Sequence, residues 1–208
     1  MLATAGITSS TLSRQGQGSA APYEERSASD WELIKVIARG NRAAMAALYR
    51  RHHVRVYRFA LRITDNATLA EDIVSDVFLD VWRLAGTFKG DAQVSTWLLS
   101  IARNKCLSTF RRRIDEPLDD AKVGRIADGT EQPEALVQRK DRNAALQRCI
   151  SKLSHSHREV IDLCYYHEKS VGEVAQILGV PPNTVKTRMF YARCRLESLL
   201  RAAGIDSI

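Results

Sequence analysis

The stretch that most constrains this chain lies near its C-terminal end, where two short helical patterns meet at a tight turn. It spans Ser170–Arg195 and reads SVGEVAQILGVPPNTVKTRMFYARCR. Ser170 and Glu173 have the spacing of a capping box, in which two side chains satisfy free backbone amides at a helix start. Gly179 stands where this helix must end, because glycine adopts positive φ without steric cost. One residue of the proline pair that follows can open the next helix.

The second helix of this stretch has two distinct faces. Apolar residues recur on one face at steps of four and three, which predicts a buried stripe: Val185, Met189, Ala192, Leu196 and Leu199. The other face carries Asn183, Lys186, Thr187, Phe190 and Tyr191, flanked by Arg188, Arg193 and Arg195. Donors, cations and aromatic rings suit the base edges, thymine methyl groups and phosphates of DNA. The pattern therefore favours a DNA-binding helix-turn-helix over an ordinary helical hairpin with a solvated basic face.

The charge of the chain divides it into blocks. Residues 31–113 carry 15 Lys or Arg against 7 Asp or Glu, residues 114–133 carry 2 against 6, and residues 134–208 carry 12 against 8. Two basic blocks around an acidic segment suggest two surfaces that face a polyanion. Pro and Gly in residues 114–133 are typical of a linker. We expect a tail over residues 1–29, too polar to order, then helical domains over 30–113 and 134–208.

Helical periodicity runs through both blocks, and no strand pattern is found. Ser29 and Glu32 form a capping box before a helix that ends near Gly40, and longer helices follow from Asn41, over 68–84 and over 94–113. In the second block, a helix over 133–153 precedes a third capping box at Ser156–Glu159, which should open a helix to Tyr166. The fold class is therefore all-α, with two small helical domains joined by an acidic linker.

Two further surfaces suggest a function in the first block. One helix face carries Glu71, Asp72, Ser75, Asp76 and Asp80, which form either a solvated surface or a docking face for a protein. A loop at Phe88–Asp91 leads into a basic helix that contains Trp97, Arg103 and the run Arg111–Arg113. Such a loop and helix could hold unstacked single-stranded bases, although Trp97 itself fits a core position better.

Other functional classes receive weaker support. His52 and His53 fit a partly solvated basic face. A metal or redox sensor would need Cys149, His155, His157, Cys164 and His167, but their spacing is not that of a zinc finger. The sequence shows no phosphate loop, nucleophile motif or ligand cluster with a general base, so no enzyme, cofactor or metal is expected. No apolar run could span a membrane and no secretory signal is seen, and unpaired cysteines favour a reducing cytoplasm.

Several motifs resemble one protein family when taken together. Ala70–Trp82 (AEDIVSDVFLDVW) looks like the second conserved region of bacterial sigma factors, and Phe88–Arg113 looks like their promoter-melting region. Arg158–Val160, Glu173–Ala175 and Thr184–Arg188 look like their fourth region. A short linker in place of an intermediate domain is similar to the extracytoplasmic-function group. This resemblance covers residues 31–203 in the right order.

The resemblance implies a role for each surface. The face of Glu71, Asp72, Ser75, Asp76 and Asp80 would bind the β′ clamp of RNA polymerase core, and the C-terminal domain would bind the β flap. The minus-ten element would be captured by Lys89, Gly90, Asp91, Gln93, Arg103, Asn104 and Lys105. The minus-thirty-five element would be read by Lys186, Thr187, Arg188, Phe190 and Tyr191. An anti-sigma factor commonly controls this group, often in a stress or envelope response.

A stand-alone transcriptional regulator is the alternative hypothesis. It would explain the helix-turn-helix but not the acidic face or the basic helix around Trp97. It predicts tight binding to duplex DNA without polymerase, as a dimer on half-sites about one helical turn apart.

Overall fold

The computed structural model describes residues 28–115 and 144–204, and every regular element in these ranges is helical. The first range contains α2 (Asp30–Ile37), α3 (Arg42–Thr64), α4 (Ala67–Leu84), the short 3-10 helix η1 (Ala85–Thr87) and α5 (Val94–Asp115). The second contains a helix over residues 144–151, then α7 (His155–Ile161), the π-helical segment η2 (Asp162–Tyr166), α8 (Val171–Leu178) and α9 (Pro182–Ala202). The predicted all-α class is confirmed.

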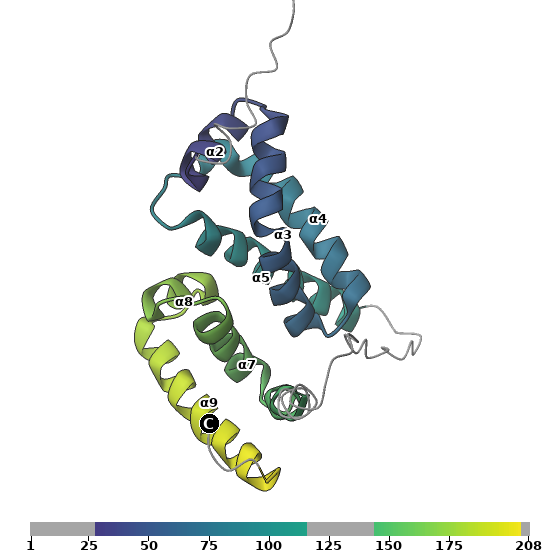
Figure 1. Cartoon of the computed structure of the whole chain (residues 1–208), viewed down its shortest axis with the longest axis vertical. Coiled ribbons are helices and arrows are strands. Elements are labelled where there is room, and N and C mark those ends of the chain that lie inside the picture. Colours follow the sequence, from purple (N-terminus) through teal and green to yellow (C-terminus); the bar gives the residue numbers. More distant parts are fainter. Residues whose placement is uncertain (1–27, 116–143, 205–208) are drawn as a thin grey trace, which may run out of the picture.

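The first four α-helices form an N-terminal group around one apolar core. In Figure 1, α3 and α4 run side by side, and α5 packs against both. Leu48, Phe59, Val77, Val81 and Leu98 are buried in this core. Each such side chain stabilises the fold by about 1.5–3 kcal/mol relative to its exposed state.

Caps set the ends of these helices, and those at Ser29 and Asn41 lie where the sequence predicts helix starts. Ser29 and Glu32 form the expected capping box at the start of α2, and the Asn41 side chain accepts a hydrogen bond from the Ala44 amide at the start of α3. Asp65 ends α3 with φ at 52°, in the left-handed region, and Asn66 then caps α4. A two-residue turn therefore returns the chain against α3.

The C-terminal group contains the predicted helix-turn-helix. Ser170 and Glu173 cap α8 reciprocally, Gly179 ends it with φ at 63°, and Pro182 is the first residue of α9. The α9 stripe is buried through Val185, Met189 and Ala192, while Leu196 and Leu199 are half-buried.

The third predicted capping box is wrong. The N-cap of α7 is Ser154, whose side chain accepts from the His157 amide, and the helix begins at His155. Glu159 therefore lies too far along the helix to reach back to the cap, and its carboxylate turns to Arg103 instead. The expected helix to Tyr166 is also interrupted, because α7 ends at Ile161 and the chain continues as η2.

The two groups pack against each other. Contacts join α5 to α8 and α3 to α7, and Phe59 of α3 lies edge-on to the His167 ring at 5.6 Å between centroids. Residues 1–27 and 116–143 lie outside the described residues. They include nearly all of the predicted tail and linker. Among the described helices, none combines the length and the apolar content needed to cross a bilayer.

Candidate nucleic-acid interfaces

The face of α9 opposite its buried stripe is open to solvent. Phe190 and Tyr191 are 63% and 58% exposed, and their rings meet edge-on at 5.5 Å. Lys186 and Thr187 are exposed one turn earlier, while Arg188 is half-buried. The Thr187 hydroxyl donates to the Asn183 carbonyl at 3.0 Å, which fixes its rotamer on the helix. The structure therefore brings together the residues expected to read the minus-thirty-five element.

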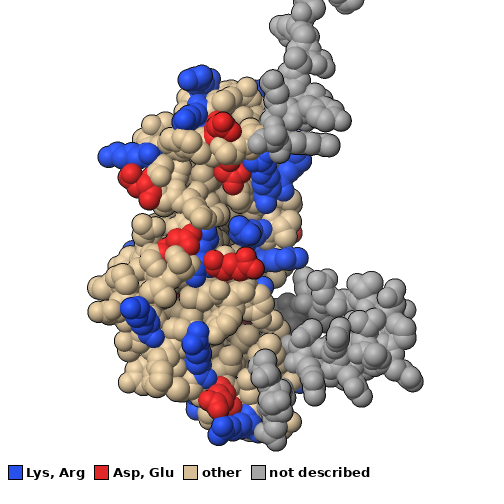
Figure 2. All heavy atoms as spheres, turned by 60° about the vertical axis from the view of Figure 1, so that its left-hand side comes forward, with Lys and Arg blue, Asp and Glu red and all other residues tan. Residues whose placement is uncertain are grey.

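The charge pattern of this side of the molecule differs between its two halves. Figure 2 shows blue and red side chains mixed over the upper and middle parts, whereas the lower half is mostly tan, with scattered blue and one red group near its lower end. Height is unchanged from Figure 1, so the lower half belongs to the C-terminal helices. A surface with few charges, most of them cations, and with exposed aromatics suits contact with bases as well as phosphates.

The loop between η1 and α5 rests on an aromatic cluster. The Phe88 ring stacks on Trp97 at 4.6 Å and meets Trp31 edge-on at 5.4 Å. Gly90 has φ at 82°, and a Cβ there would lie 3.2 Å from the Trp31 ring. Sequence reasoning missed Trp31, because it comes from α2 and only the fold brings it under the loop.

Two hollows flank this loop. A hollow of about 530 Å³ is lined by Asp30 and Trp31 together with residues 88–90 and 92–95. A smaller hollow of about 280 Å³ contains Lys89, Asp91 and Trp97, and Gln176 of α8 closes one side of it. Lys89, Gly90, Asp91 and Gln93 are all exposed. The loop residues expected at the minus-ten element therefore surround openings bounded by aromatic rings.

The three consecutive polar residues of α5 point to different surroundings. Arg103 donates from Nε to the Glu159 carboxylate at 2.8 Å, across the contact between the two groups. Asn104 is exposed. Lys105 lies 2.7 Å from the Asp80 carboxylate and 4.0 Å from that of Asp76, on α4. Only Asn104 among these residues lies open to a strand of DNA in this arrangement.

The predicted docking face on α4 is exposed. Glu71, Asp72, Ser75 and Asp76 all face solvent, and Asp80 is half-buried by its contact with Lys105. Beside them lies an apolar hollow of about 590 Å³, lined by Arg42, Met45, Tyr49, Ser75, Phe78, Leu79 and Trp82. The sequence indicated the acids but not the hollow, because three of its seven lining residues come from α3. Leu79 and Trp82, which fall outside the buried α4 stripe, were the available signal.

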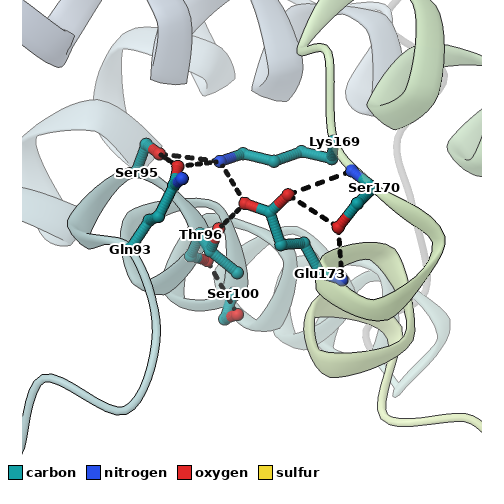
Figure 3. A network of polar contacts seen from close by, with 7 residues as sticks. All are labelled: Gln93, Ser95, Thr96, Ser100, Lys169, Ser170 and Glu173. Atoms are coloured by element: carbon teal, nitrogen blue, oxygen red, sulfur yellow. Dashed lines mark hydrogen bonds and ion pairs between the residues drawn. The ribbon is translucent and has the colours of Figure 1, made fainter.

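A polar network joins the start of α5 to the start of α8 (Figure 3). Lys169 Nζ donates to Ser95 Oγ at 2.7 Å, to Gln93 Oε1 at 3.2 Å and to Glu173 Oε1 at 2.8 Å. The Thr96 hydroxyl donates to the same Glu173 oxygen at 2.7 Å. Burial of Glu173 raises its pKa, but hydrogen bonds from Lys169, Thr96 and Ser170 outweigh burial and hold the pKa at about 2. Glu173 is therefore a carboxylate at neutral pH.

A second cluster connects α3 to η2. Arg62 makes an ion pair with Asp162, and its guanidinium also lies over the Tyr166 ring at 3.8 Å. His167 Nε2 is 3.1 Å from the other Asp162 oxygen, and both side chains are 3% exposed. His167 thus faces Asp162 and Phe59. Within residues 28–115 and 144–204, no three His, Cys, Asp or Glu side chains are grouped to hold a metal ion.

The cysteines differ in exposure. Cys106 and Cys149 are buried, Cys164 is half-buried and Cys194 is exposed, and all four are free thiols. Burial raises the pKa of Cys106 to about 12 and also raises that of Cys164. These two side chains are therefore neutral thiols, which are poor nucleophiles and poor metal ligands.

The prediction that His52 lies on a partly solvated basic face is wrong. It is 6% exposed, and its Nε2 lies 2.6 Å from the Asp30 carboxylate, which also pairs with Arg51. The hydrogen bond with His52 is the main reason that the pKa of Asp30 falls to about 2, against the opposing effect of burial. Asp30, His52 and Arg51 therefore fix α2 on α3.

Comparison with known proteins matches both groups of helices. Residues 48–114 match the family model for sigma-70 region 2, and residues 143–196 match that for sigma-70 region 4. The chain is 36% identical over 175 residues to the ECF RNA polymerase sigma factor SigM of Mycobacterium tuberculosis H37Rv, covering 83% of this chain and 85% of the relative. It is 31% identical over 178 residues to the ECF RNA polymerase sigma factor SigW of Bacillus subtilis 168, covering 81% and 95%.

A solved structure supports the same assignment. CnrH in complex with the cytosolic domain of CnrY has a TM-score of 0.62 and 28% identity, covering 83% of this chain and 97% of the matched chain. Both region models, the sequence relatives and this structure agree on one family. The chain is a member of the ECF RNA polymerase sigma factors, which direct core polymerase to promoters.

Proposed function

We propose that this sigma factor meets its partners through three surfaces of the described helices. The exposed face of α4 binds polymerase core, the loop before α5 and the start of α5 bind the minus-ten element, and α9 reads the minus-thirty-five element. The observation that carries this proposal is the α9 face, where aromatic and cationic side chains stay exposed over a buried apolar stripe.

The minus-thirty-five surface consists of Lys186, Thr187, Arg188, Phe190 and Tyr191. A recognition helix places its N-terminal half in the major groove, where short polar side chains and rings reach base edges. Arg193 and Arg195 on the later turns are near enough to the groove edge to neutralise phosphates. Because Pro182 is the first residue of α9, the five residues of the minus-thirty-five surface all fall in the first half of the helix.

The minus-ten surface consists of Lys89, Gly90, Asp91, Gln93, Arg103, Asn104 and Lys105. A base that leaves the duplex loses stacking, at a cost of a few kcal/mol, and a pocket bounded by rings can replace it. The hollows beside Trp31, Phe88 and Trp97 have that composition. In this proposal the chain has no catalytic step of its own, since melting is driven by binding.

The polymerase surface joins the acids of α4 to the apolar hollow beside them. Glu71, Asp72, Ser75, Asp76 and Asp80 would give charge complementarity to a basic clamp, which raises the association rate. Tyr49, Leu79 and Trp82 would supply the desolvated centre that carries most of the affinity in protein interfaces.

The domain limits follow the same reasoning. We assign residues 30–113 to the minus-ten and core-binding domain, 134–208 to the minus-thirty-five and β-flap domain, 114–133 to the linker and 1–29 to a tail.

CnrH is known in complex with the cytosolic domain of another protein. By analogy, an anti-sigma factor holds this chain in the cytoplasm until an envelope or stress signal releases it.

Transcription in vitro tests this function. The purified chain is mixed with sigma-free bacterial core polymerase and promoter fragments from its own genome. Discrete start sites that need both components are expected, and they would also define the promoter sequence. Transcription should be lost with Lys186→Ala and kept with Arg201→Ala, a cation on the last turn of α9 that pairs with Glu197. Tight duplex binding by the chain alone, with no transcript from any fragment, would favour the stand-alone regulator.

A further inference from the structure

Four arginines line one hollow between α3 and the C-terminal helices, which we call the arginine cleft. The hollow has a volume of about 500 Å³. Arg58 and Arg62 come from α3, Arg148 from the helix over residues 144–151 and Arg158 from α7. The carboxylates in its lining are those of Asp65 and Asp162. Because four guanidinium groups face two carboxylates, the cleft has a net positive charge.

The four cations of the cleft differ in how firmly they are held. Arg58 and Arg148 have exposed side chains with no ion-pair or hydrogen-bond partner in the part of the chain that the structure describes. Arg62 pairs with Asp162, and Arg158 donates from Nη2 at 2.6 Å to a backbone carbonyl of the helix that precedes α7. Two fixed guanidinium groups are thus joined by two that can close on an anion.

An aromatic ring forms another part of the cleft. The Arg62 guanidinium lies over the Tyr166 ring at 3.8 Å, and Gln147 donates to the Tyr166 hydroxyl at 3.1 Å. Tyr166 is still 39% exposed. Aromatic rings and guanidinium planes both stack on nucleobases, whatever the identity of the base. Groups that match phosphates and groups that match a base therefore lie in one hollow.

We propose that the arginine cleft binds a nucleoside polyphosphate. Arginine suits such a ligand because its planar fork can donate two parallel hydrogen bonds to phosphate oxygens. The volume of the cleft is also that of a small-molecule site, which is typically about 300–1,000 Å³. This inference goes beyond the proposed function, because binding would need neither polymerase nor promoter.

The shape of the cleft favours a small ligand over a nucleic acid. A surface that follows a DNA or RNA strand spreads its cations along a groove. Here the cations converge from three helices on a single hollow, whose lining also includes the apolar side chains of Leu61, Ile150 and Ile161. Apolar walls with a few convergent polar groups are typical of sites for small molecules.

Titration calorimetry of the free full-length chain tests the proposal. The probes are ATP, GTP and inorganic tripolyphosphate, without divalent cations and at one physiological ionic strength. We expect one nucleotide to bind per chain, and tripolyphosphate to bind the same site at least about threefold more weakly because it has no base to stack. Failure of both nucleotides to bind would overturn the proposal. Tripolyphosphate that binds as tightly as either nucleotide would overturn the assignment of a nucleoside.

A matched pair of double variants locates the binding site. The test variant combines Arg58→Gln with Arg148→Gln, and the control combines Arg39→Gln with Arg83→Gln, two exposed positions outside the cleft that give the same change in net charge. The test variant should bind ATP at least about tenfold more weakly than wild type, because it loses two charge-assisted contacts to phosphate. The control should stay within about twofold, as is usual for exposed substitutions. Equal losses in the two variants would mean that the basic chain attracts nucleotides without a site, and would overturn the proposal.

Photolabelling of the unmutated chain gives a second test. An azido derivative of ATP should attach to the peptide that contains Gln147 or Tyr166, and excess ATP should prevent this. A single-stranded oligonucleotide at the same phosphate concentration should leave the labelling unchanged. Attachment to α9 or to the loop before α5 would mean that the nucleotide imitates DNA at the promoter surfaces, and would overturn the proposal. Displacement by the oligonucleotide would make the cleft a nucleic-acid site instead.

Discussion

The carboxylate of Glu173 lies 2.8 Å from the ammonium group of Lys169, and its other oxygen accepts from the Ser170 amide at the start of α8. One side chain thus caps a helix and joins that helix to α5 through Thr96. The two tasks can be separated by substitution, because glutamine can cap but carries no charge.

We expect Glu173→Ala to be less stable than Glu173→Gln. Alanine loses both the cap and the ion pair, whereas glutamine loses only the ion pair, and a helix cap contributes about 1 kcal/mol. Urea unfolding of both variants measures the difference in the free energy of unfolding. Equal stability of the two would mean that the cap contributes nothing at this position.

The stability of the chain should depend on pH through Glu173. Its pKa is about 2 in the folded chain against a usual value of 4.5, so its contribution to stability is fully present above pH 4.5 and is lost as the pH falls toward 2. Glu173→Gln has no such group. The stability difference between wild type and this variant should therefore shrink through that range, as followed by urea midpoints. A constant difference across the range would contradict the depressed pKa.

Gly90→Ala should impair the loop before α5. The glycine has φ at 82°, and the added methyl group would approach the Trp31 ring to 3.2 Å, so the loop must shift. A non-glycine residue in this region costs about 1–2 kcal/mol. We expect weaker formation of open complexes in a permanganate footprint, with normal binding to polymerase core. Gly86→Ala is the control, because no described atom lies within 4 Å of a Cβ at that position.

Leu79→Ala should weaken the complex with polymerase core by about fivefold or more, since exposed apolar residues at the centre of an interface carry much of its affinity. Leu79 is 53% exposed and lines the apolar hollow, so its removal should leave folding stability nearly unchanged. Leu84→Ala is the matched control, because Leu84 is 41% exposed on the same helix but lies outside that hollow. A fluorescence titration of core polymerase compares the two variants. The same affinity for both would place the core-binding surface elsewhere.

Phe190→Ala and Val185→Ala should fail in different ways although both lie on α9. Phe190 is 63% exposed, so alanine should change the free energy of unfolding by less than about 0.5 kcal/mol while it weakens binding to minus-thirty-five duplex. Val185 is fully buried, and alanine there should cost about 2 kcal/mol. Thermal unfolding and duplex binding together distinguish these outcomes. A destabilised Phe190→Ala would mean that its ring packs in the fold.

Local sequence patterns predicted most of the fold. The features that they missed depend on contacts between residues distant in sequence. The capping boxes at Ser29 and Ser170 were predictable because both partners lie within four residues. The same motif failed at Ser156, since a one-turn signal cannot show that Glu159 has a stronger partner in Arg103. His52 failed for the same reason, because Asp30 reaches it only through the packing of α2 on α3.

The candidate sites also divide into features set by residues close in sequence and features set by distant contacts. The α9 face was predictable in full, since every residue on it belongs to one helix. Arg103, Asn104 and Lys105 are adjacent in sequence, yet periodicity could not show that their neighbours would be Glu159, solvent and Asp80. Trp31 beneath Gly90 likewise needed the folded chain.

The unequal exposure of the four thiols gives this protein a built-in place for chemical labelling. Cys194 is exposed on α9, whereas Cys106 and Cys149 are buried and Cys164 is half-buried with a raised pKa. A maleimide reagent under mild conditions should therefore react first with Cys194, because thiolate character and access set the rate. A dye or spin label can then report on α9 in the unmutated chain, and its signal can follow each step of promoter engagement.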